Sequence, residues 1–195
     1  MKRLFDVVVA GVALLVLSPL LLLVALAIAI EDGRPILFVQ PRLGRGNTFF
    51  QIYKFRSMRV DMTDHNGTVS ADREDRRVTR IGKFIRRTSI DELPQLFNVL
   101  RGHMSLVGPR PHAIGSQAGE RLFWEVDDRY WLRHALKPGL TGLAQVRGFR
   151  GATESELDLS SRLNADLEYL NGWSLWRDVM ILLTTVRVLV HDRAY

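Results

Sequence analysis

The chain has 195 residues, which is room for one domain with a hydrophobic core, or for one domain and a membrane element. Its formal net charge of +6 indicates an anionic partner: nucleic acid, anionic lipid or a phosphorylated substrate. The sequence has no cysteine, which excludes disulfides and thiolate chemistry, and its five histidines lack the spacing of zinc ligands.

The first predicted element is an almost wholly apolar run from Leu4 to Ile30, which is long enough to cross a bilayer as a helix. It is too long for a cleaved signal peptide and lacks a clean small-residue cleavage site. Pro19 removes one backbone hydrogen bond, and the Ser18 hydroxyl can satisfy the carbonyls that this change frees. We therefore expect a kink at Ser18 and Pro19.

Cationic residues on both sides of this run predict how it meets the membrane. Lys2 and Arg3 precede it, and Arg34 begins a series of basic residues that follow it. The positive-inside rule favours both ends in the cytosol, which a straight span cannot provide. A helix that is bent at Ser18 and Pro19 and re-enters the same leaflet satisfies the rule. A simple kinked span is the alternative.

Two short segments rich in β-forming residues come next, Ile36–Val39 and Phe49–Tyr53, and the glycine-containing loop between them suits a hairpin. Basic and apolar residues then alternate, so that a strand would present Lys54 and Arg56 on one face. Such a stripe is more often a solvated or lipid-facing edge than a substrate clamp. Residues 61–77 are polar and charged, which predicts a long surface loop, either a lid or a disordered insertion.

Residues 86–100 hold two adjacent carboxylates between a pair of arginines and an apolar run that predicts a helix. Ser89 and Glu92 have the spacing of a capping box, which would put Asp91 in the first helical turn. If Pro94 is instead the first helical residue, both carboxylates lie on the turn before the helix. In either arrangement a carboxylate lies near free backbone N–H groups, which keep it ionised. It can then serve as a nucleophile or metal ligand in phosphate chemistry, and a capped helix with ordinary surface ion pairs is the alternative.

Two turns that combine proline, glycine and a cation follow. Arg110 lies between Pro109 and Pro111, where its backbone has little freedom. The Lys-Pro-Gly-Leu-Thr-Gly segment at 137–142 has the Pro-Gly centre of a type II turn. Rigid turns that present arginine and lysine suit a pre-organised phosphate site, although either one alone is only a turn.

Two helices are predicted near the C-terminus. The first covers residues 154–169 and presents four leucines on one face, Leu157, Leu163, Leu167 and Leu170. Ser174 caps the second, which continues to Val190 with a broad apolar stripe and has Trp173 and Trp176 at its start. This second helix packs in the core or lies at the membrane surface, where tryptophan is favoured.

Five motifs in one order closely resemble the bacterial sugar transferases, which are monotopic phosphoglycosyl transferases. They cover nearly the whole chain and comprise Ser18-Pro19 in the apolar helix, Tyr53–Met58, Ser89–Val99, Met104–Pro111 and Lys137–Val146. The resemblance is closest to members that load glucose or galactose, and Pro111-His112-Ala113 and the Ala194-Tyr195 end favour glucose. Many relatives have an additional N-terminal multi-span region, so we expect a short or truncated member.

The resemblance implies an α-rich α+β fold with a short β-hairpin and amphipathic interfacial helices. A re-entrant membrane helix over residues 1–32 would pack on a catalytic domain over residues 33–195, at the bacterial inner membrane and facing the cytoplasm. The implied reaction transfers hexose-1-phosphate from a UDP-sugar such as UDP-glucose to undecaprenyl phosphate and releases UMP. Asp91 is the implied nucleophile, which forms a covalent sugar-phosphate and is associated with Mg²⁺. The product would initiate the assembly of an exopolysaccharide, a capsule or an O-antigen.

The other site residues have expected roles as well. Glu92 supports Asp91, because neighbouring helical residues project about 100° apart and cannot easily share one metal ion. The expected substrate-binding residues are basic and polar side chains of the motifs, Lys54, Arg56, Arg86, Arg110, Lys137, Thr141, Gln145 and Arg147. Membrane lipid is an expected partner, nucleic acid is not, and a homodimer is left open. Two other classes of protein remain as alternatives: a membrane-tethered basic binding domain, and a scaffolding subunit without catalysis.

Overall fold

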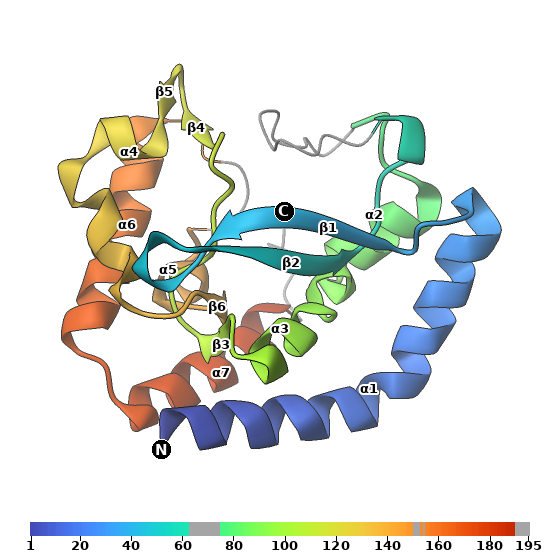
Figure 1. Ribbon diagram of the computed structural model, residues 1–195, viewed down its shortest axis with the longest axis horizontal. Helices are drawn as coiled ribbons and strands as arrows, with labels where there is room; N and C mark the ends of the chain where they lie inside the picture. The colour runs from blue at the N-terminus through green and yellow to red at the C-terminus, as the bar shows by residue number, and fades with distance from the viewer. Residues whose placement is uncertain (63–74, 150–152, 154, 190–195) are drawn as a thin grey trace.

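One long helix, α1 (Lys2–Asp32), lies along one side of the molecule, and the other elements pack within its bend (Figure 1). The computed structural model describes residues 1–62, 75–149, 153 and 155–189. After α1, the described elements are β1 (Leu37–Leu43), η1 (Arg45–Asn47), β2 (Phe49–Phe55), η2 (Val60–Met62), α2 (Arg80–Arg87), η3 (Ile90–Glu92), α3 (Gln95–Arg101), β3 (Ser105–Val107), β4 (Gln117–Ala118), β5 (Arg121–Leu122), α4 (Phe123–Val126), η4 (Asp128–Ala135), β6 (Gly139–Thr141), α5 (Leu143–Val146), α6 (Glu156–Asn171) and α7 (Leu175–Leu189), where η marks a 3₁₀ helix. The α-rich fold with small sheets agrees with the prediction.

Helix α1 is bent near its middle, as Ser18 and Pro19 predict (Figure 1). The Ser18 hydroxyl donates a hydrogen bond of 2.8 Å to the carbonyl of Leu15. That carbonyl is the one that Pro19, which has no N–H, leaves without its helical donor. Within the described part of the chain, α1 alone is long and apolar enough to cross a membrane, and only 11% of its most apolar window is buried.

Polar side chains join the first turns of α1 to the folded domain. Asp6 is buried and accepts hydrogen bonds of 2.9–3.0 Å from the Ser105 hydroxyl and of 3.0 Å from the Leu106 amide. Lys2 forms a 2.5 Å ion pair with Asp178 at the start of α7. Because a buried carboxylate without donors is strongly unfavourable, these bonds fix the N-terminal arm of α1 in place.

The last turn of α1 contacts the same domain. The two carboxylate oxygens of Glu31 accept hydrogen bonds from the N–H groups of Arg80 and Ile81, at 2.8 and 2.9 Å. These N–H groups belong to the first turn of α2, where backbone N–H groups have no hydrogen-bond partner within the helix. The Arg56 guanidinium donates to the carbonyls of Asp32 and of the next residue, both at 2.9 Å. One domain therefore holds both ends of a 31-residue helix.

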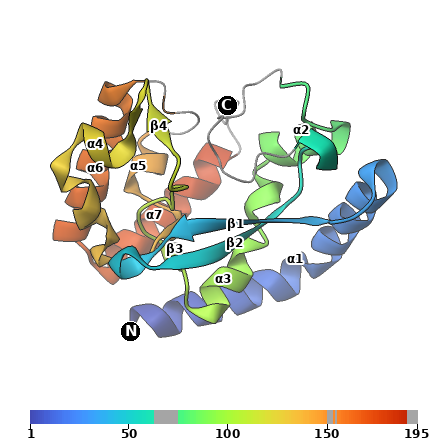
Figure 2. The same cartoon turned by 45° about the horizontal axis from the view of Figure 1, so that its top comes forward.

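Strands β1 and β2 form the predicted hairpin, which lies over α3 (Figure 2). Both strands are longer than predicted, because the antiparallel pairing continues past Val39 to Leu43. The outer edge of β2 is bonded to α3 through the buried side chain of Asn98. Its oxygen accepts from the Tyr53 N–H at 3.0 Å, and its nitrogen donates to the Gln51 carbonyl at 2.6 Å. These two bonds fix the position of β2 on α3.

Strands β3 and β6 pair in parallel, although the sequence predicts a type II turn for the second of them. Gly139, the expected centre of that turn, donates its N–H to the Pro109 carbonyl at 2.9 Å, and the Gly108 N–H donates to the Thr141 carbonyl at 2.9 Å. A Cβ atom on Gly139 would lie 2.1 Å from the nitrogen of Gly108. The turn prediction is wrong because two glycine segments, distant in sequence, pair more closely than any side chain would allow.

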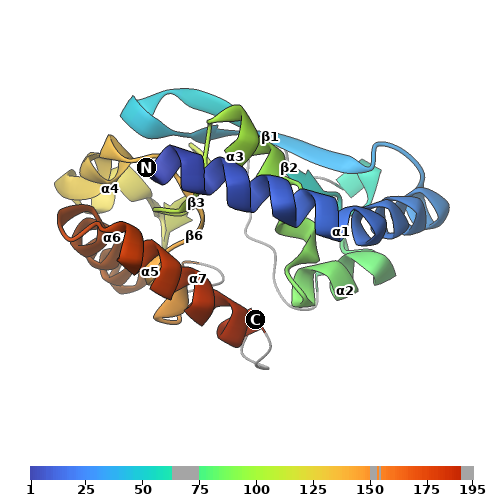
Figure 3. The same cartoon turned by 90° about the horizontal axis from the view of Figure 1, so that it is seen from below.

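Two hydrophobic clusters lie under the two arms of α1. The smaller cluster joins Val24 and Ile28 of the second arm to Phe55 and Ile85. The larger cluster joins the first arm to the hairpin, α3 and the C-terminal helices, with the buried residues Ala10, Phe50, Ile52, Leu96, Val99, Met104, Leu106, Val107, Leu143, Ala144, Ala165, Tyr169 and Ile181. Helices α1 and α7 lie on one face of the molecule (Figure 3).

Helices α6 and α7 correspond to the two predicted C-terminal helices. The Ser174 hydroxyl accepts a hydrogen bond from the Arg177 N–H at 3.1 Å, which confirms the predicted cap of α7. The predicted buried face of α6 is wrong at Leu157, which is 76% exposed, because the buried face is centred on Leu159 and Leu163. At the start of α7, Trp176 is 71% exposed.

The structure describes only the ends of the surface loop predicted at residues 61–77. Its first residues belong to η2, and near its far end Asp75 forms a 2.6 Å ion pair with Arg77. Residues 63–74 lie outside the described residues, as do the predicted features at Glu154, Val190, Ala194 and Tyr195.

Candidate active site

The adjacent carboxylates Asp91 and Glu92 lie on η3, a tight turn between α2 and α3. Ser89, just before this turn, has φ 55°, a left-handed conformation that few residues other than glycine adopt, and its side chain makes no capping bond. The predicted capping box is therefore wrong. The alternative is confirmed in that both carboxylates lie on the turn before the helix, although Pro94 is the N-terminal cap residue of α3 and not its first helical residue.

Glu92 is held between two cations. Its Oε1 accepts from Lys54 Nζ at 2.9 Å and from Arg110 Nη2 at 2.5 Å, and its Oε2 accepts from Arg110 Nη1 at 3.1 Å. Burial opposes ionisation of Glu92, but Arg110 and Lys54 outweigh it and hold the pKa of this carboxyl far below its usual range. The structure thus brings together the predicted site residues Lys54, Glu92 and Arg110, and Glu92 is the counter-ion of the two cations.

Asp91 is in a different electrostatic environment from its neighbour. Its side chain is buried, and burial together with the negative charge of Glu92 raises its pKa from 3.8 to about 6, against the opposing effect of Lys54, Arg86 and Arg110. A carboxylate with this pKa is ionised at neutral pH and is more basic than a surface carboxylate. Asp91 therefore has the properties of a reactive carboxylate, whereas Glu92 has those of a structural one.

Arg110 is held in place through its backbone by a buried arginine. Arg133, which is 2% exposed, donates to the Arg110 carbonyl at 2.8 Å and to His112 Nδ1 at 3.0 Å. Two other bonds, at 2.6 and 2.9 Å, join Arg133 to Asp166 on α6. Burial and the charge of Arg133 lower the pKa of His112, so that its ring is neutral and accepts this hydrogen bond. The segment that presents Arg110 is rigid, as its two prolines predict.

Two other predicted binding residues have partners away from the Asp91–Glu92 turn. Arg56 is 4% exposed and bonds to the C-terminal end of α1, so its observed role is to hold that end. Arg147 follows α5 and forms an exposed ion pair of 2.5 Å with Glu168.

The predicted residues of the 137–146 segment also have other partners. The Thr141 hydroxyl is 2.7 Å from the Thr185 hydroxyl on α7, and Gln145 Nε2 donates to the Leu140 carbonyl at 3.3 Å. The Lys137 ammonium and the Arg3 guanidinium of α1 both lie near Gly102, each within 3.6 Å of where a Cβ of that glycine would be, and burial and the charge of Arg3 lower the pKa of Lys137. The structure therefore connects Lys54 and Arg110 with the carboxylate pair through hydrogen bonds and Arg86 through its charge, and it gives Arg56, Thr141, Gln145 and Arg147 partners elsewhere.

Arg42 is a basic residue near the site that sequence reasoning missed. It lies on β1, and its guanidinium donates to the side-chain oxygen of Gln40. Burial and the charge of Arg110 lower its pKa to about 10, and the charge of Glu92 partly offsets this effect. The hairpin register would have indicated that Arg42 lies on the same face as Lys54. Phe38 and Arg42 face the same way because alternate residues of β1 do so, and Phe38 pairs with Lys54.

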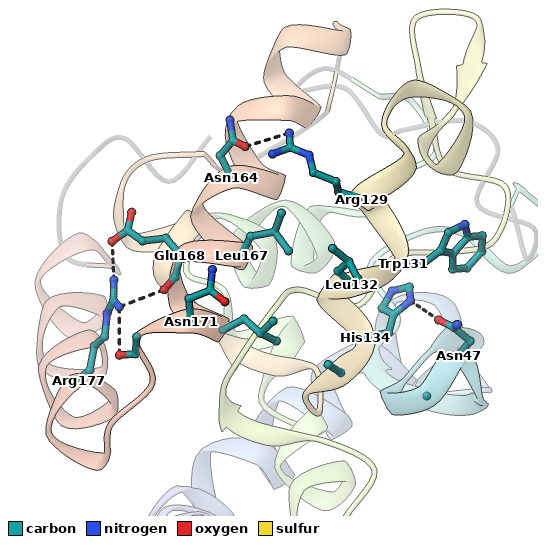
Figure 4. A pocket seen from close by; sticks show the side chains of 14 residues that line it. Asn47, Arg129, Trp131, Leu132, His134, Asn164, Leu167, Glu168, Asn171 and Arg177 are labelled. Carbon is teal, nitrogen blue, oxygen red and sulfur yellow. Dashed lines mark hydrogen bonds and ion pairs between the residues drawn. The ribbon is translucent and has the colours of Figure 1, made fainter.

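A hollow of about 1010 Å³ lies between η1, η4 and α6 (Figure 4). Trp131, Leu132 and Leu167 line it together with polar side chains such as Asn164 and His134. None of the predicted site residues lines this hollow. It is distinct from the Asp91–Glu92 turn and is not the candidate site.

The donor set at the turn fits a magnesium ion only in one arrangement. The described residues contain no group of three or more histidine and acidic side chains that could enclose a metal. The oxygens of Glu92 are already bonded to Lys54 and Arg110. Mg²⁺ is commonly held by one or two carboxylates together with substrate phosphates and water. Asp91 alone, with a diphosphate substrate, meets that requirement.

Comparisons with known proteins complete the description of the site. A family model described as bacterial sugar transferase matches residues 1–192. The chain is 51% identical, over 98% of its length, to an undecaprenyl-phosphate glucose phosphotransferase of Komagataeibacter xylinus, of which it covers 36%. It is 49% identical, over 95% of its length, to the exopolysaccharide production protein PSS of Rhizobium leguminosarum bv. phaseoli, of which it covers 93%. It is 50% identical, over 100% of its length, to a UDP-glucose:undecaprenyl-phosphate glucose-1-phosphate transferase of Caulobacter vibrioides, of which it covers 72%.

Proposed function

Because the chain belongs to the bacterial sugar transferase family, we propose that it transfers hexose-1-phosphate from a UDP-sugar to undecaprenyl phosphate and releases UMP. The observation that carries this proposal is the buried, reactive carboxylate of Asp91 beside a Glu92 that is paired with two cations. The names of the relatives from Komagataeibacter and Caulobacter support glucose as the sugar. The name of the Rhizobium relative supports a role in exopolysaccharide production.

The reaction we propose has two displacement steps at one phosphorus atom. In the first, a carboxylate oxygen of Asp91 attacks the sugar-bearing phosphorus of the UDP-sugar, and the bond from that phosphorus to the oxygen of the departing UMP breaks. In the second, a phosphate oxygen of undecaprenyl phosphate attacks the same phosphorus, and the Asp91 carboxylate leaves. The products are UMP and a lipid diphosphate that carries the sugar, so that all atoms and charges balance.

The neighbouring side chains have distinct tasks in this scheme. Arg110, Lys54 and Arg86 bring positive charge to the place where phosphate oxygens must lie, which favours the crowded, highly charged transition state. Glu92 holds Arg110 and Lys54 in position through hydrogen bonds. Its charge also raises the pKa of Asp91 and so the basicity of the attacking carboxylate.

Asp91 is also the residue that would hold Mg²⁺, together with oxygens of the diphosphate. The ion, when bound, would neutralise phosphate charge and make the departing UMP a better leaving group. The protein itself supplies the ionised Asp91 and the surrounding arginines, and the paired Glu92 keeps a supporting role.

The proposal also places the enzyme on a membrane through a re-entrant α1. Asp6 at one end of α1 and Glu31 at the other both bond to the same domain, which supports a helix that enters and leaves one leaflet. Between these ends the helix exposes large apolar side chains, among them Leu15 at 77%, Leu22 at 71% and Leu23 at 65%. We therefore propose a monotopic enzyme at the cytoplasmic face of the bacterial inner membrane.

Mass spectrometry of the enzyme incubated with UDP-glucose alone tests the two-step scheme. We expect one hexose phosphate on the peptide that contains Asp91, and up to one equivalent of UMP. Asp91→Asn should give neither product. Asp127→Asn, which alters the acidic cap residue just before η4, is the matched control and should keep both. Sugar transfer without an adduct, or turnover by Asp91→Asn, would contradict the covalent step.

A further inference from the structure

Arg42 has no role in the reaction as described above. Its guanidinium is partly buried, and its Nε has no hydrogen-bond partner among the described residues. The guanidinium donates a hydrogen bond to the neutral side chain of Gln40, and it forms no ion pair within the part of the chain that the structure describes. Among the described residues, no carboxylate therefore bonds directly to this positive charge.

The hairpin register places this charge on the face that touches the active site. Residues that pair across two strands point to the same side, and so do alternate residues of one strand. Phe38 pairs with Lys54 and Arg42 pairs with Phe50, so Arg42 and Lys54 share one face of the hairpin. Lys54 bonds to Glu92 at one end of that face. The bond from Arg42 to Gln40 turns its guanidinium along the strand towards that end.

The segment that carries Arg110 runs beside the same strand. Leu43, the next residue after Arg42, donates its N–H to the carbonyl of His112 at 3.3 Å. Arg110 lies two residues before that carbonyl and extends its side chain to Glu92. The charges of both Arg110 and Glu92 affect the pKa of Arg42, as expected for groups in one cluster.

The charges of this cluster do not balance. Lys54, Arg86, Arg110 and Arg42 contribute four positive charges, against two negative charges from Glu92 and the ionised Asp91. Partial burial makes an unbalanced guanidinium unfavourable, because water and counter-ions reach it poorly. A bound anion would remove that penalty. The planar fork of a guanidinium suits two oxygens of a phosphate.

We propose that Arg42, with Arg110, binds a phosphate group of a substrate beside the Asp91–Glu92 turn. The inference rests on the proposed function, and it adds a binding residue to it. Two substrates of the reaction carry this chemistry: the nucleotide, through the phosphate that leaves as UMP, and the lipid acceptor, through its terminal phosphate. Because Glu92 already occupies one side of the Arg110 guanidinium, Arg42 supplies donors that Arg110 cannot supply alone.

Binding measurements on the full chain in detergent test this assignment. The probes are UMP, uridine and a short-chain isoprenyl phosphate, each titrated into the wild type and into Arg42→Gln by calorimetry. Loss of a charge-assisted contact should weaken binding of the phosphate that Arg42 holds by roughly 10- to 100-fold. Uridine has no phosphate, so its affinity should stay the same. The probe that weakens identifies the source of the phosphate.

Two further variants separate this role from general effects of charge and stability. Arg45→Gln removes the same charge at the exposed tip of the hairpin, and should leave the affinity of every probe unchanged. Arg42→Lys keeps the charge without the fork and should weaken phosphate binding less than Arg42→Gln, which matters if the glutamine variant folds poorly. Equal phosphate affinities in the wild type and both Arg42 variants would overturn the inference and leave the proposed function standing. A wild type that binds neither UMP nor the isoprenyl phosphate would overturn both.

Discussion

Arg110 and Glu92 form a two-point pair, with nitrogen–oxygen distances of 2.5 and 3.1 Å, between a proline-flanked segment and the turn after α2. This pair helps to shift the pKa values of two carboxylates that are adjacent in sequence in opposite directions. Glu92 is held ionised by Arg110 and Lys54, while burial and the charge of Glu92 make Asp91 more basic.

Formation of the sugar-phosphate adduct should depend on pH through Asp91. Only the ionised carboxylate attacks phosphorus, and burial raises the pKa of Asp91 to about 6. The single-turnover rate of UMP release should therefore be constant at neutral pH and fall as the pH decreases through about 6. Rapid-quench assays across this range provide the measurement. A rate that declines only near the ordinary aspartate pKa would contradict the raised value.

Replacement of Glu92 by glutamine should shift the fall in the rate of UMP release to a lower pH. The negative charge of Glu92 is one of the two causes that raise the pKa of Asp91, so its removal lowers this pKa. The same substitution leaves Lys54 and Arg110 without their counter-ion, and should reduce stability by about 3 kcal/mol or more. Melting temperatures and pH–rate profiles of Glu92→Gln measure the two effects separately. If the rate of UMP release falls at the same pH in Glu92→Gln as in the wild type, Glu92 does not influence the pKa of Asp91.

Asp91→Asn should stabilise the protein at neutral pH while it abolishes activity. The pKa of Asp91 is higher in the folded state than its ordinary value of 3.8, so folding is penalised whenever this group must be ionised. The penalty is complete above about pH 6, shrinks between 6 and 3.8, and is absent below that range. A shift of this size corresponds to up to about 3 kcal/mol. Melting curves of wild type and variant at pH 8 and pH 4 should therefore differ more at pH 8.

Gly139→Ala should destabilise the protein strongly. The added Cβ would lie 2.1 Å from the Gly108 nitrogen and 2.3 Å from the Thr141 carbonyl oxygen, so the pairing of β3 and β6 must open. Gly11→Ala is the matched control, because no atom lies within 4 Å of its added Cβ and alanine favours helix by up to about 1 kcal/mol. Thermal unfolding should show a large loss for the first variant and none for the second. Similar melting temperatures would show that the strands tolerate a side chain.

Both ends of α1 should be accessible from the cytosol only. Two single-cysteine variants, one with a cysteine inserted at position 2 directly after Met1 and one with Arg34→Cys, place a thiol outside each end of the helix, and the sequence has no other cysteine to interfere. A membrane-impermeant maleimide should label neither variant in intact cells and should label both after the inner membrane is opened. Labelling of either position from the periplasmic side would contradict the re-entrant helix.

Local sequence signals predict those features of the molecule that local interactions decide. Ser18 and Pro19 predict the bend of α1 because a proline removes one specific hydrogen bond, and alternating β-formers predict the hairpin. The same signals fail where distant segments decide. Ser89 and Glu92 have capping-box spacing, but Lys54 and Arg110 bind the Glu92 carboxylate instead.

Local sequence also predicts only part of the candidate site. Asp91, Glu92 and Arg110 stand out because adjacent carboxylates and an arginine between prolines are unusual in a short stretch of sequence. Arg42 does not stand out, because its relation to the site depends on which β1 residue faces Lys54. Arg56 has a basic side chain in the right motif, yet its partner is the end of α1, which no local pattern indicates.

The attachment of α1 has a consequence for the order of events during synthesis. Lys2 and Asp6 leave the ribosome well before their partners Asp178 and Ser105, which lie 176 and 99 residues further along the chain. Until those partners are made, the polar bonds that fix the N-terminal arm of α1 to the rest of the protein cannot form. The ion pair between Lys2 and Asp178 can form only when α7 has emerged, so the synthesis of α7 completes the attachment of α1.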